Sequence, residues 1–136
     1  MKRKMKRKKH LLQNHGKLDN IQTVLTSEEI QKYQALVKQI IVEPQLLEYI
    51  AKLVVNTREN AFLYLGASPR ASIAILNAAK GYAAIRGRDF VTPEDIKEAA
   101  IPVLQHRVIV TPEREMEGIT SVEIIKQIIE AIEIPR

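Results

Sequence analysis

Residues 66–87 read GASPRASIAILNAAKGYAAIRG and predict a single apolar helix with a clear start and end. Ser68 fits the N-cap position, because its hydroxyl can accept a hydrogen bond from an otherwise unpaired backbone N–H. Pro69 follows at the first helical position, where its missing N–H costs nothing. Gly87 suits the left-handed residue that ends many helices. Apolar residues cover more than one face of this helix, so we expect neighbouring elements to surround it.

Arg70 lies in the first turn of the predicted helix, beside the positive end of the helix dipole, where a cation is disfavoured. Two sources of positive charge at one place indicate a site for an anion, most often a phosphate. The plainer interpretation is a solvated arginine at a helix start. The local pattern alone does not separate the two interpretations.

Other stretches also begin like helices. Residues 26–29 (TSEE) and 120–123 (TSVE) are capping boxes, and residues 92–95 (TPED) combine a cap, a first-position proline and acids. Pro44 begins a further helix, and apolar residues recur at helical spacing after each of these starts. We therefore predict an all-α domain, a bundle of five or six helices with at most a short strand at residues 108–110.

Three details of this bundle follow from the same pattern. Residues 58–65 are expected to form a loop that leads into the central helix. Pro102 should bend or break the helix that starts near Thr92, because proline removes a backbone donor. The buried stripe of the Pro44 helix is expected to comprise Leu46, Leu47, Ile50, Leu53, Val54 and Thr57.

The composition fits one ordinary globular domain. The chain has 136 residues, of which 46% are hydrophobic and 27% are charged. It has no cysteine, which excludes disulfides, thiolate nucleophiles and Cys-ligated metals. No apolar run approaches the roughly 20 residues of a membrane span, and the basic start lacks the apolar region of a secretory signal. We expect a cytoplasmic protein without membrane contact.

The net charge of +5 comes from one end of the chain. Residues 1–10 hold seven of the 21 basic residues and no acid, which leaves 14 basic and 16 acidic residues elsewhere. We predict that residues 1–19 are a basic tail, disordered or added in cloning, and that residues 20–136 are the helical domain. Any contact of residues 1–10 with nucleic acid would be weak and nonspecific.

The sequence carries no catalytic or metal-binding signature. No P-loop is present, because no glycine-rich segment leads into the required Lys and Ser/Thr. His10, His15 and His106 have neither cysteine partners nor i, i+4 spacing, so no metal site is predicted. The acid pairs at residues 28–29 and 94–95 are explained by helix dipoles. We predict no catalytic residue and no activity for this chain alone.

Three blocks resemble the C-terminal lid, a small helical domain, of MoxR-type AAA+ ATPases. They are residues 65–72 (LGASPRAS), 87–96 (GRDFVTPEDI) and 102–107 (PVLQHR), in the family's order and spacing. The helices that begin near Thr26 and Pro44 and the isoleucine-rich C-terminal helix also fit. The resemblance covers about residues 20–134 and implies an AAA+ lid-type bundle.

The resemblance implies that Arg70 is the sensor 2 arginine, which reaches the terminal phosphates of bound ATP, with Gly66, Ser68 and Pro69 forming the supporting helix start. A guanidinium group offers paired donors to phosphate oxygens. The parent protein would then be an ATP hydrolase that uses ATP with Mg²⁺, neither of them tightly bound to this chain. Whether Arg70 serves its own subunit or a neighbour stays open.

The resemblance also implies partners. These are a P-loop core domain, in the same parent chain or in a neighbouring subunit, a homo-oligomeric ring, and clients that include von Willebrand A domain proteins. The lid would couple ATP binding and hydrolysis to ring assembly and chaperone-like remodelling. The chain departs from the family because the core is absent, so we expect an excised lid or a truncated gene product.

The sequence leaves two alternatives open. A histone-fold-like DNA-binding dimer also has a long central helix, a short turn like residues 88–95 and a final helix. The slightly acidic body and the Ser68-Pro69-Arg70 start do not belong to that pattern. The other alternative is a non-catalytic helical module that binds a partner helix in an apolar groove.

Overall fold

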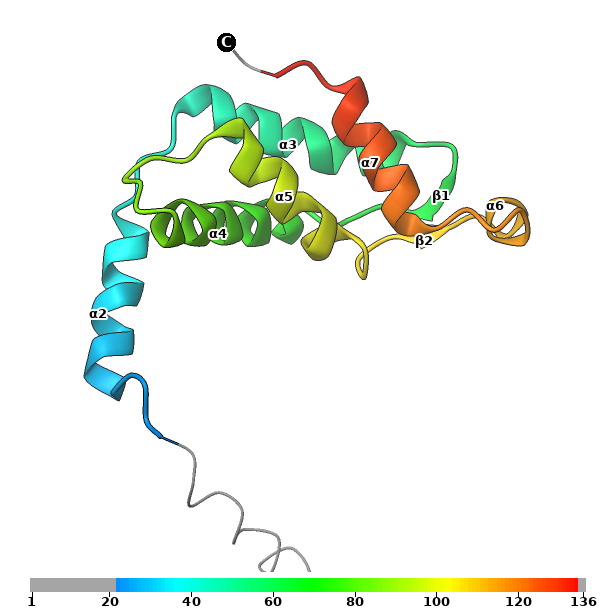
Figure 1. Cartoon of the computed structure of the whole chain (residues 1–136). Coiled ribbons are helices and arrows are strands. Elements are labelled where there is room, and N and C mark those ends of the chain that lie inside the picture. Colours follow the sequence, from blue (N-terminus) through cyan, green and yellow to red (C-terminus); the bar gives the residue numbers. More distant parts are fainter. Residues whose placement is uncertain (1–21, 135–136) are drawn as a thin grey trace, which may run out of the picture. The chain divides into compact units, whose positions relative to one another are not determined.

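The computed structural model describes residues 22–134, shown in Figure 1. The elements in chain order are α2 (Ser27–Lys38), α3 (Pro44–Glu59), β1 (Leu63–Leu65), α4 (Arg70–Ile85), α5 (Pro93–Leu104), β2 (Ile109–Val110), α6 (Pro112–Met116) and α7 (Ser121–Ala131). This part of the chain confirms the predicted all-α bundle with a short strand.

The chain divides into two compact units, residues 1–33 and residues 34–136, and the second unit holds the bundle. The prediction of a basic tail, with its nucleic-acid contact, lies outside the described residues. The boundary predicted between residues 19 and 20 also falls there, so it stays a prediction.

Helix α2 contains the boundary between the two units. It begins at the predicted capping box: the Thr26 N–H donates to Glu29 Oε2 at 2.8 Å, and the Glu29 N–H donates to Thr26 Oγ1 at 3.2 Å. No residue of α2 is buried. Its apolar side chains Ile30, Tyr33 and Leu36 are all exposed.

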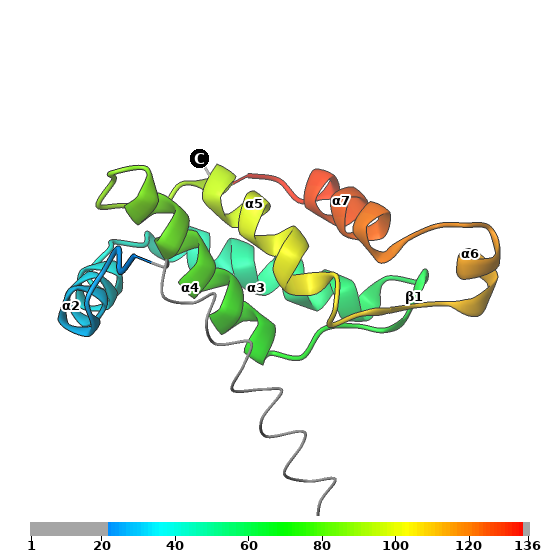
Figure 2. The ribbon, with the colours of Figure 1, turned by 60° about the horizontal axis from the view of Figure 1, so that its bottom comes forward.

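Four helices enclose the core of the second unit. Helix α4 contacts α3 and α5, and α7 contacts the same two helices, so the four form a closed set of neighbours. Figure 2 shows α4 and α5 running side by side. The largest fully buried apolar side chains are Tyr49, Ile50, Leu53, Ile75, Ile96, Leu104, Ile124 and Ile125.

The central helix α4 buries one stripe of residues, three of which are alanines. Its buried residues are Ala71, Ile75, Ala79 and Ala83. Their spacing of four residues aligns them along one side, and the alanines allow α5 to pack closely. Ile73 and Ile85 are 61% and 84% exposed. The expectation that neighbours surround this helix is therefore wrong for the described structure.

A small antiparallel sheet joins residues far apart in sequence. Leu63 pairs with Val110 and Leu65 with Ile109, with an irregularity between the two pairs. The predicted short strand is confirmed at Ile109–Val110, but the predicted loop is wrong at residues 63–65. A strand this short forms only against its partner.

Two further expectations need correction. The predicted break at Pro102 is wrong, because helix α5 continues through Pro102 to Leu104. A proline at this position removes one helical hydrogen bond, and the helix continues despite that loss. In α3, Leu47 is 45% exposed, whereas Tyr49 is 2% exposed and belongs to the core. The other predicted stripe residues of α3 are buried.

Candidate functional site

Arg70 is the first residue of α4, and its side chain is exposed. None of the ion pairs or side-chain hydrogen bonds found among residues 22–134 involves Arg70. No acidic residue lies in the first turn of α4. The guanidinium group therefore stands beside the positive end of the helix dipole without a counter-charge from the described chain.

The start of α4 differs from the prediction in one respect. Pro69 already has helical backbone angles, φ −55° and ψ −26°, and no side chain caps the helix. The Ala71 N–H donates to the Ser68 carbonyl at 2.9 Å, and the Ser72 N–H donates to the Pro69 carbonyl at 3.1 Å. Backbone carbonyls thus take the place predicted for the Ser68 hydroxyl.

The segment before Arg70 is hydrogen-bonded to the last turn of α3. The Thr57 hydroxyl donates to the Val54 carbonyl at 2.6 Å and accepts a hydrogen bond from the Ala67 N–H at 2.9 Å. Thr57 is 0% exposed, and Ala67 is 1% exposed. A buried N–H without a partner is costly, so this hydrogen bond fixes the chain path toward Arg70.

Gly66 lies directly on the backbone of α3. A Cβ atom at this position would stand 2.5 Å from both the Arg58 Cα atom and the Thr57 carbonyl oxygen. Only a residue without a side chain allows this approach. Gly66 therefore supports the helix start through close packing.

Sequence reasoning placed Thr57 in a buried stripe and missed its hydrogen bond to Ala67. A threonine within an apolar stripe is a usable signal, because a buried hydroxyl needs a partner. The identity of that partner, ten residues along the chain, could not be read from the pattern.

Arg70 shares an exposed face of α4 with two residues on the following turns. Ile73 and Asn77 are also exposed, and their spacing from Arg70 places all three on the same side of the helix. This face, Arg70–Ile73–Asn77, combines a cation, an apolar side chain and an amide. It lies opposite the buried alanine stripe.

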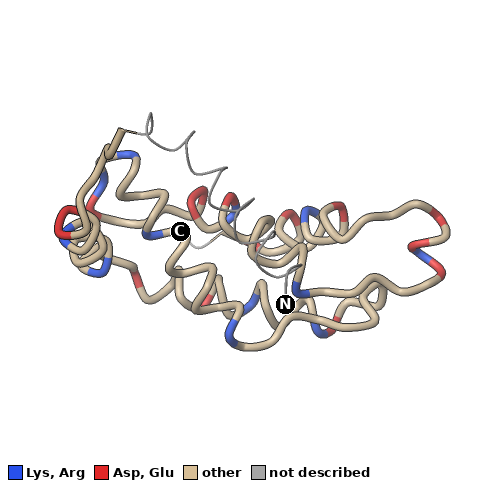
Figure 3. Tube along the Cα trace, turned by 90° about the horizontal axis from the view of Figure 1, so that it is seen from below, with Lys and Arg blue, Asp and Glu red and all other residues tan. Residues whose placement is uncertain are grey.

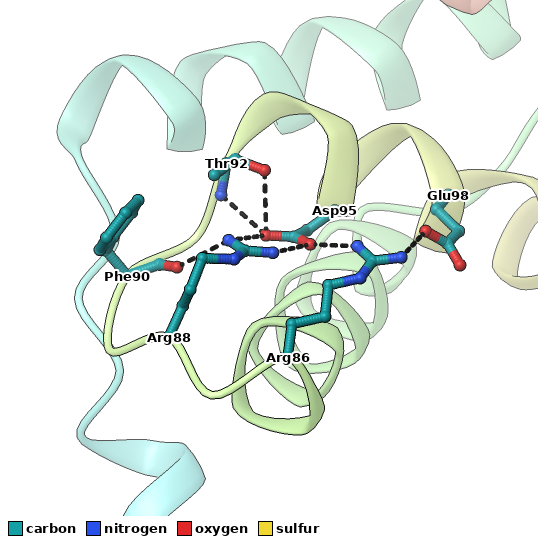
Figure 4. A network of polar contacts seen from close by, with 6 residues as sticks. All are labelled: Arg86, Arg88, Phe90, Thr92, Asp95 and Glu98. Carbon is teal, nitrogen blue, oxygen red and sulfur yellow. Dashed lines mark hydrogen bonds and ion pairs between the residues drawn. The ribbon is translucent and has the colours of Figure 1, made fainter.

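A second polar cluster joins the end of α4 to the start of α5 (Figure 4). The Asp95 side chain is 0% exposed and accepts two hydrogen bonds from Arg88, at 2.7 and 2.8 Å. Arg86 donates to the same carboxylate at 2.6 Å and also pairs with Glu98. The Thr92 N–H and hydroxyl donate to Asp95 Oδ2 at 2.9 and 3.1 Å.

These contacts control the charge of Asp95. Burial by itself would raise its pKa, but the hydrogen bonds from Arg88, Thr92 and Arg86 together hold the pKa well below its ordinary range. Helix-dipole complementarity, predicted as the reason for this acid, is therefore an incomplete explanation. Because each charge has a partner of opposite sign, the cluster fixes the α4–α5 connection and leaves no free group for a ligand.

The remaining candidates carry no site. His106 Nδ1 lies 3.1 Å from the Pro102 carbonyl oxygen at the end of α5, as expected of a capping histidine. Within residues 22–134, no group of three or more His, Asp and Glu residues could hold a metal ion. None of the described helices is long and apolar enough to cross a membrane.

Comparisons with known proteins point to one domain family. The family model of the AAA lid domain matches residues 55–128. Protein YeaC of Bacillus subtilis is 35% identical over 118 residues, which is 87% of this chain and 37% of YeaC. Chaperone MoxR1 of Mycobacterium tuberculosis is 29% identical over 122 residues, 83% of this chain and 32% of MoxR1.

A crystal structure of a proposed ATPase from Cytophaga hutchinsonii has the same fold, with a TM-score of 0.80 and 30% sequence identity. The match covers 95% of this chain and 44% of the other. The chain thus spans about a third of the curated relatives that it matches. Since the family model covers more than half of it, the chain belongs to the AAA lid domain family, and it is similar to part of a MoxR chaperone.

Proposed function

We propose that this chain is the nucleotide-sensing lid of a MoxR-type AAA+ ATPase and that Arg70 contacts the terminal phosphates of ATP held by a P-loop core. The observation that carries the proposal is the exposed Arg70 guanidinium, without an acidic partner among the described residues, at the start of α4. A guanidinium group beside a helix N-terminus attracts phosphate oxygens and can bind two of them at once.

The surroundings of Arg70 support this role. The Thr57–Ala67 hydrogen bond and the close approach of Gly66 fix the start of α4 relative to α3. Ile73, 61% exposed on the same face, offers an apolar contact for the core beside the phosphate contact. A core docked on this face would exclude water around Arg70 and strengthen its attraction to phosphate.

ATP hydrolysis would be coupled to lid movement through the γ-phosphate. While ATP with Mg²⁺ is bound in the core, Arg70 holds the lid toward the nucleotide; hydrolysis removes that contact and releases the lid. In a homo-oligomeric ring the core belongs to the same subunit or to its neighbour. The movement would serve chaperone-like remodelling of client proteins, von Willebrand A domain proteins among them.

To test the proposal, this chain is mixed with a matching MoxR-type core or fused to it, and ATP hydrolysis is measured. The Arg70→Ala change should reduce the kcat of ATP hydrolysis by about tenfold to a hundredfold, since hydrogen bonds to charged groups contribute about 1.5–3 kcal/mol. Arg70→Lys should restore part of the loss, because it keeps the charge but not the paired donors.

Lys126→Ala is the matched control, because it removes an exposed cation from α7. It should leave turnover unchanged. Docking is measured separately by calorimetry, so that a lid that fails to bind is not mistaken for one that fails to sense. Unchanged turnover of Arg70→Ala with docking intact would refute the proposal.

A further inference from the structure

A groove lies between β2, α6 and the start of α7. It has a volume of about 390 Å³ and is lined by Val108, Ile109, Val110, Glu115 and residues 118–121. Figures 1 and 2 show the segment from β2 through α6 leaving the bundle and returning at α7. The volume falls within the range of ligand-binding pockets.

The groove runs along the free edge of β2. Successive side chains of a strand point to opposite faces, so a groove touched by Val108, Ile109 and Val110 in succession follows the strand's edge. The sheet has two strands, and β2 pairs with β1 alone in the described structure. Its other edge can therefore pair with an added strand. Ile109, which is 52% exposed, is one of the residues that line the groove.

The lining of the groove contains one acidic residue, Glu115 of helix α6. Glu113 of the same helix and Glu117, which follows it, add acidic charge to this segment outside the lining. The Arg114 Cζ atom lies 4.2 Å from the centre of the Phe62 ring, and Arg114 Nη1 lies 2.6 Å from Glu117 Oε2. Arg114 is therefore already paired with an acid of its own segment. Neither Glu113 nor Glu115 is in an ion pair of the described structure. Figure 3 shows more acidic than basic residues at this end of the trace.

We propose that this groove binds an extended, positively charged peptide segment of a partner protein. The segment adds to β2 as a third strand, so its backbone forms hydrogen bonds with the strand edge, and a Lys or Arg side chain faces Glu115. Strand addition supplies affinity through the main chain, and the facing acid selects for basic residues. This surface is separate from Arg70, and its function does not depend on nucleotide sensing.

Fluorescence polarisation with this chain and a labelled peptide of alternating Lys and Val tests the proposal. Saturable one-to-one binding is expected. Methylation of the backbone nitrogens on the pairing side of the peptide should weaken binding by about tenfold, because it removes the strand hydrogen bonds and keeps the charge. A peptide with Glu in place of Lys should not bind measurably.

A matched pair of variants locates the contact. Glu115→Lys should weaken binding by about fivefold or more, whereas Glu130→Lys, which makes the same charge change on an exposed position of α7, should not. Circular dichroism verifies that both variants remain folded.

Equal binding of the N-methylated peptide, or equal loss in both variants, would mean nonspecific charge attraction and would overturn the proposal. Absence of saturable binding would overturn it as well. So would a homodimer abolished by Glu115→Lys, because the occupant would then be a second copy of this chain.

Discussion

The backbone N–H of Ala67 donates a 2.9 Å hydrogen bond to the hydroxyl of Thr57, and both residues are buried. This hydrogen bond fixes the segment before α4 to α3. It therefore helps to set the position of Arg70, the first residue of α4. The supporting residues of the site thus lie in α3 and in the segment between β1 and α4.

Replacing Thr57 with valine should destabilise the chain by about 1–3 kcal/mol, because the buried Ala67 N–H loses its acceptor while the side-chain shape is kept. The free energy of unfolding is measured by urea denaturation. Thr57→Ser, which retains the hydroxyl, is the control for loss of the hydrogen bond. Equal stability of Thr57→Val and the unaltered chain would contradict the role assigned to this bond.

Replacing Gly66 with alanine should destabilise the chain by about 2 kcal/mol or more, since the new Cβ atom would collide with rigid backbone atoms of α3. Gly81→Ala is the matched control. A Cβ at Gly81, inside α4, meets nothing within 4 Å, so this change should stabilise the helix by about 0.5–1 kcal/mol. The midpoint temperature of thermal unfolding should therefore fall for Gly66→Ala and rise for Gly81→Ala.

The Asp95 cluster should make stability depend on acid pH. The folded-state pKa of Asp95 lies below its unfolded value, so the stabilisation is present above about pH 4, the ordinary pKa of aspartate. It is lost as the pH falls below that value, because the unfolded chain then binds the proton first. Denaturation curves between pH 7 and pH 2 measure this loss.

Asp95→Asn should make stability less dependent on acid pH and should lower the free energy of unfolding at pH 7 by about 2 kcal/mol. This loss is smaller than for a fully buried ion pair, because solvent screens the partly exposed Arg86 and Arg88 side chains. Glu48→Gln, an exposed position of α3, should leave the acid profile of the chain unchanged. A steep acid profile that persists in Asp95→Asn would show that other groups cause it.

If the Arg70–Ile73–Asn77 face docks on a core, Ile73→Ser should weaken docking by about tenfold, because the exposed Ile73 side chain would become buried there. Stability of the free chain should change by less than about 1 kcal/mol. Ile85→Ser, 84% exposed at the other end of α4, is the control and should not affect docking. Calorimetric titration of the core with each variant provides the measurement.

The sequence by itself determined where most helices begin and end. Thr26 and Thr120 cap their helices through glutamates three residues later, and Gly87 has the left-handed φ of +69° expected after a helix end. These signals involve residues within one turn of each other, so no knowledge of the fold is needed. The order and spacing of such local motifs also explain why the resemblance to the lid family is visible in the sequence.

Only the tertiary structure decided the contacts between distant residues. It paired residues 63–65 with a strand more than forty residues later, limited burial of α4 to one stripe, and brought Arg86 and Arg88 onto Asp95. It also left Arg70 exposed while the neighbouring Ala67 was buried. Helical periodicity tells which residues share a face, but the packing of the other helices decides which face is covered.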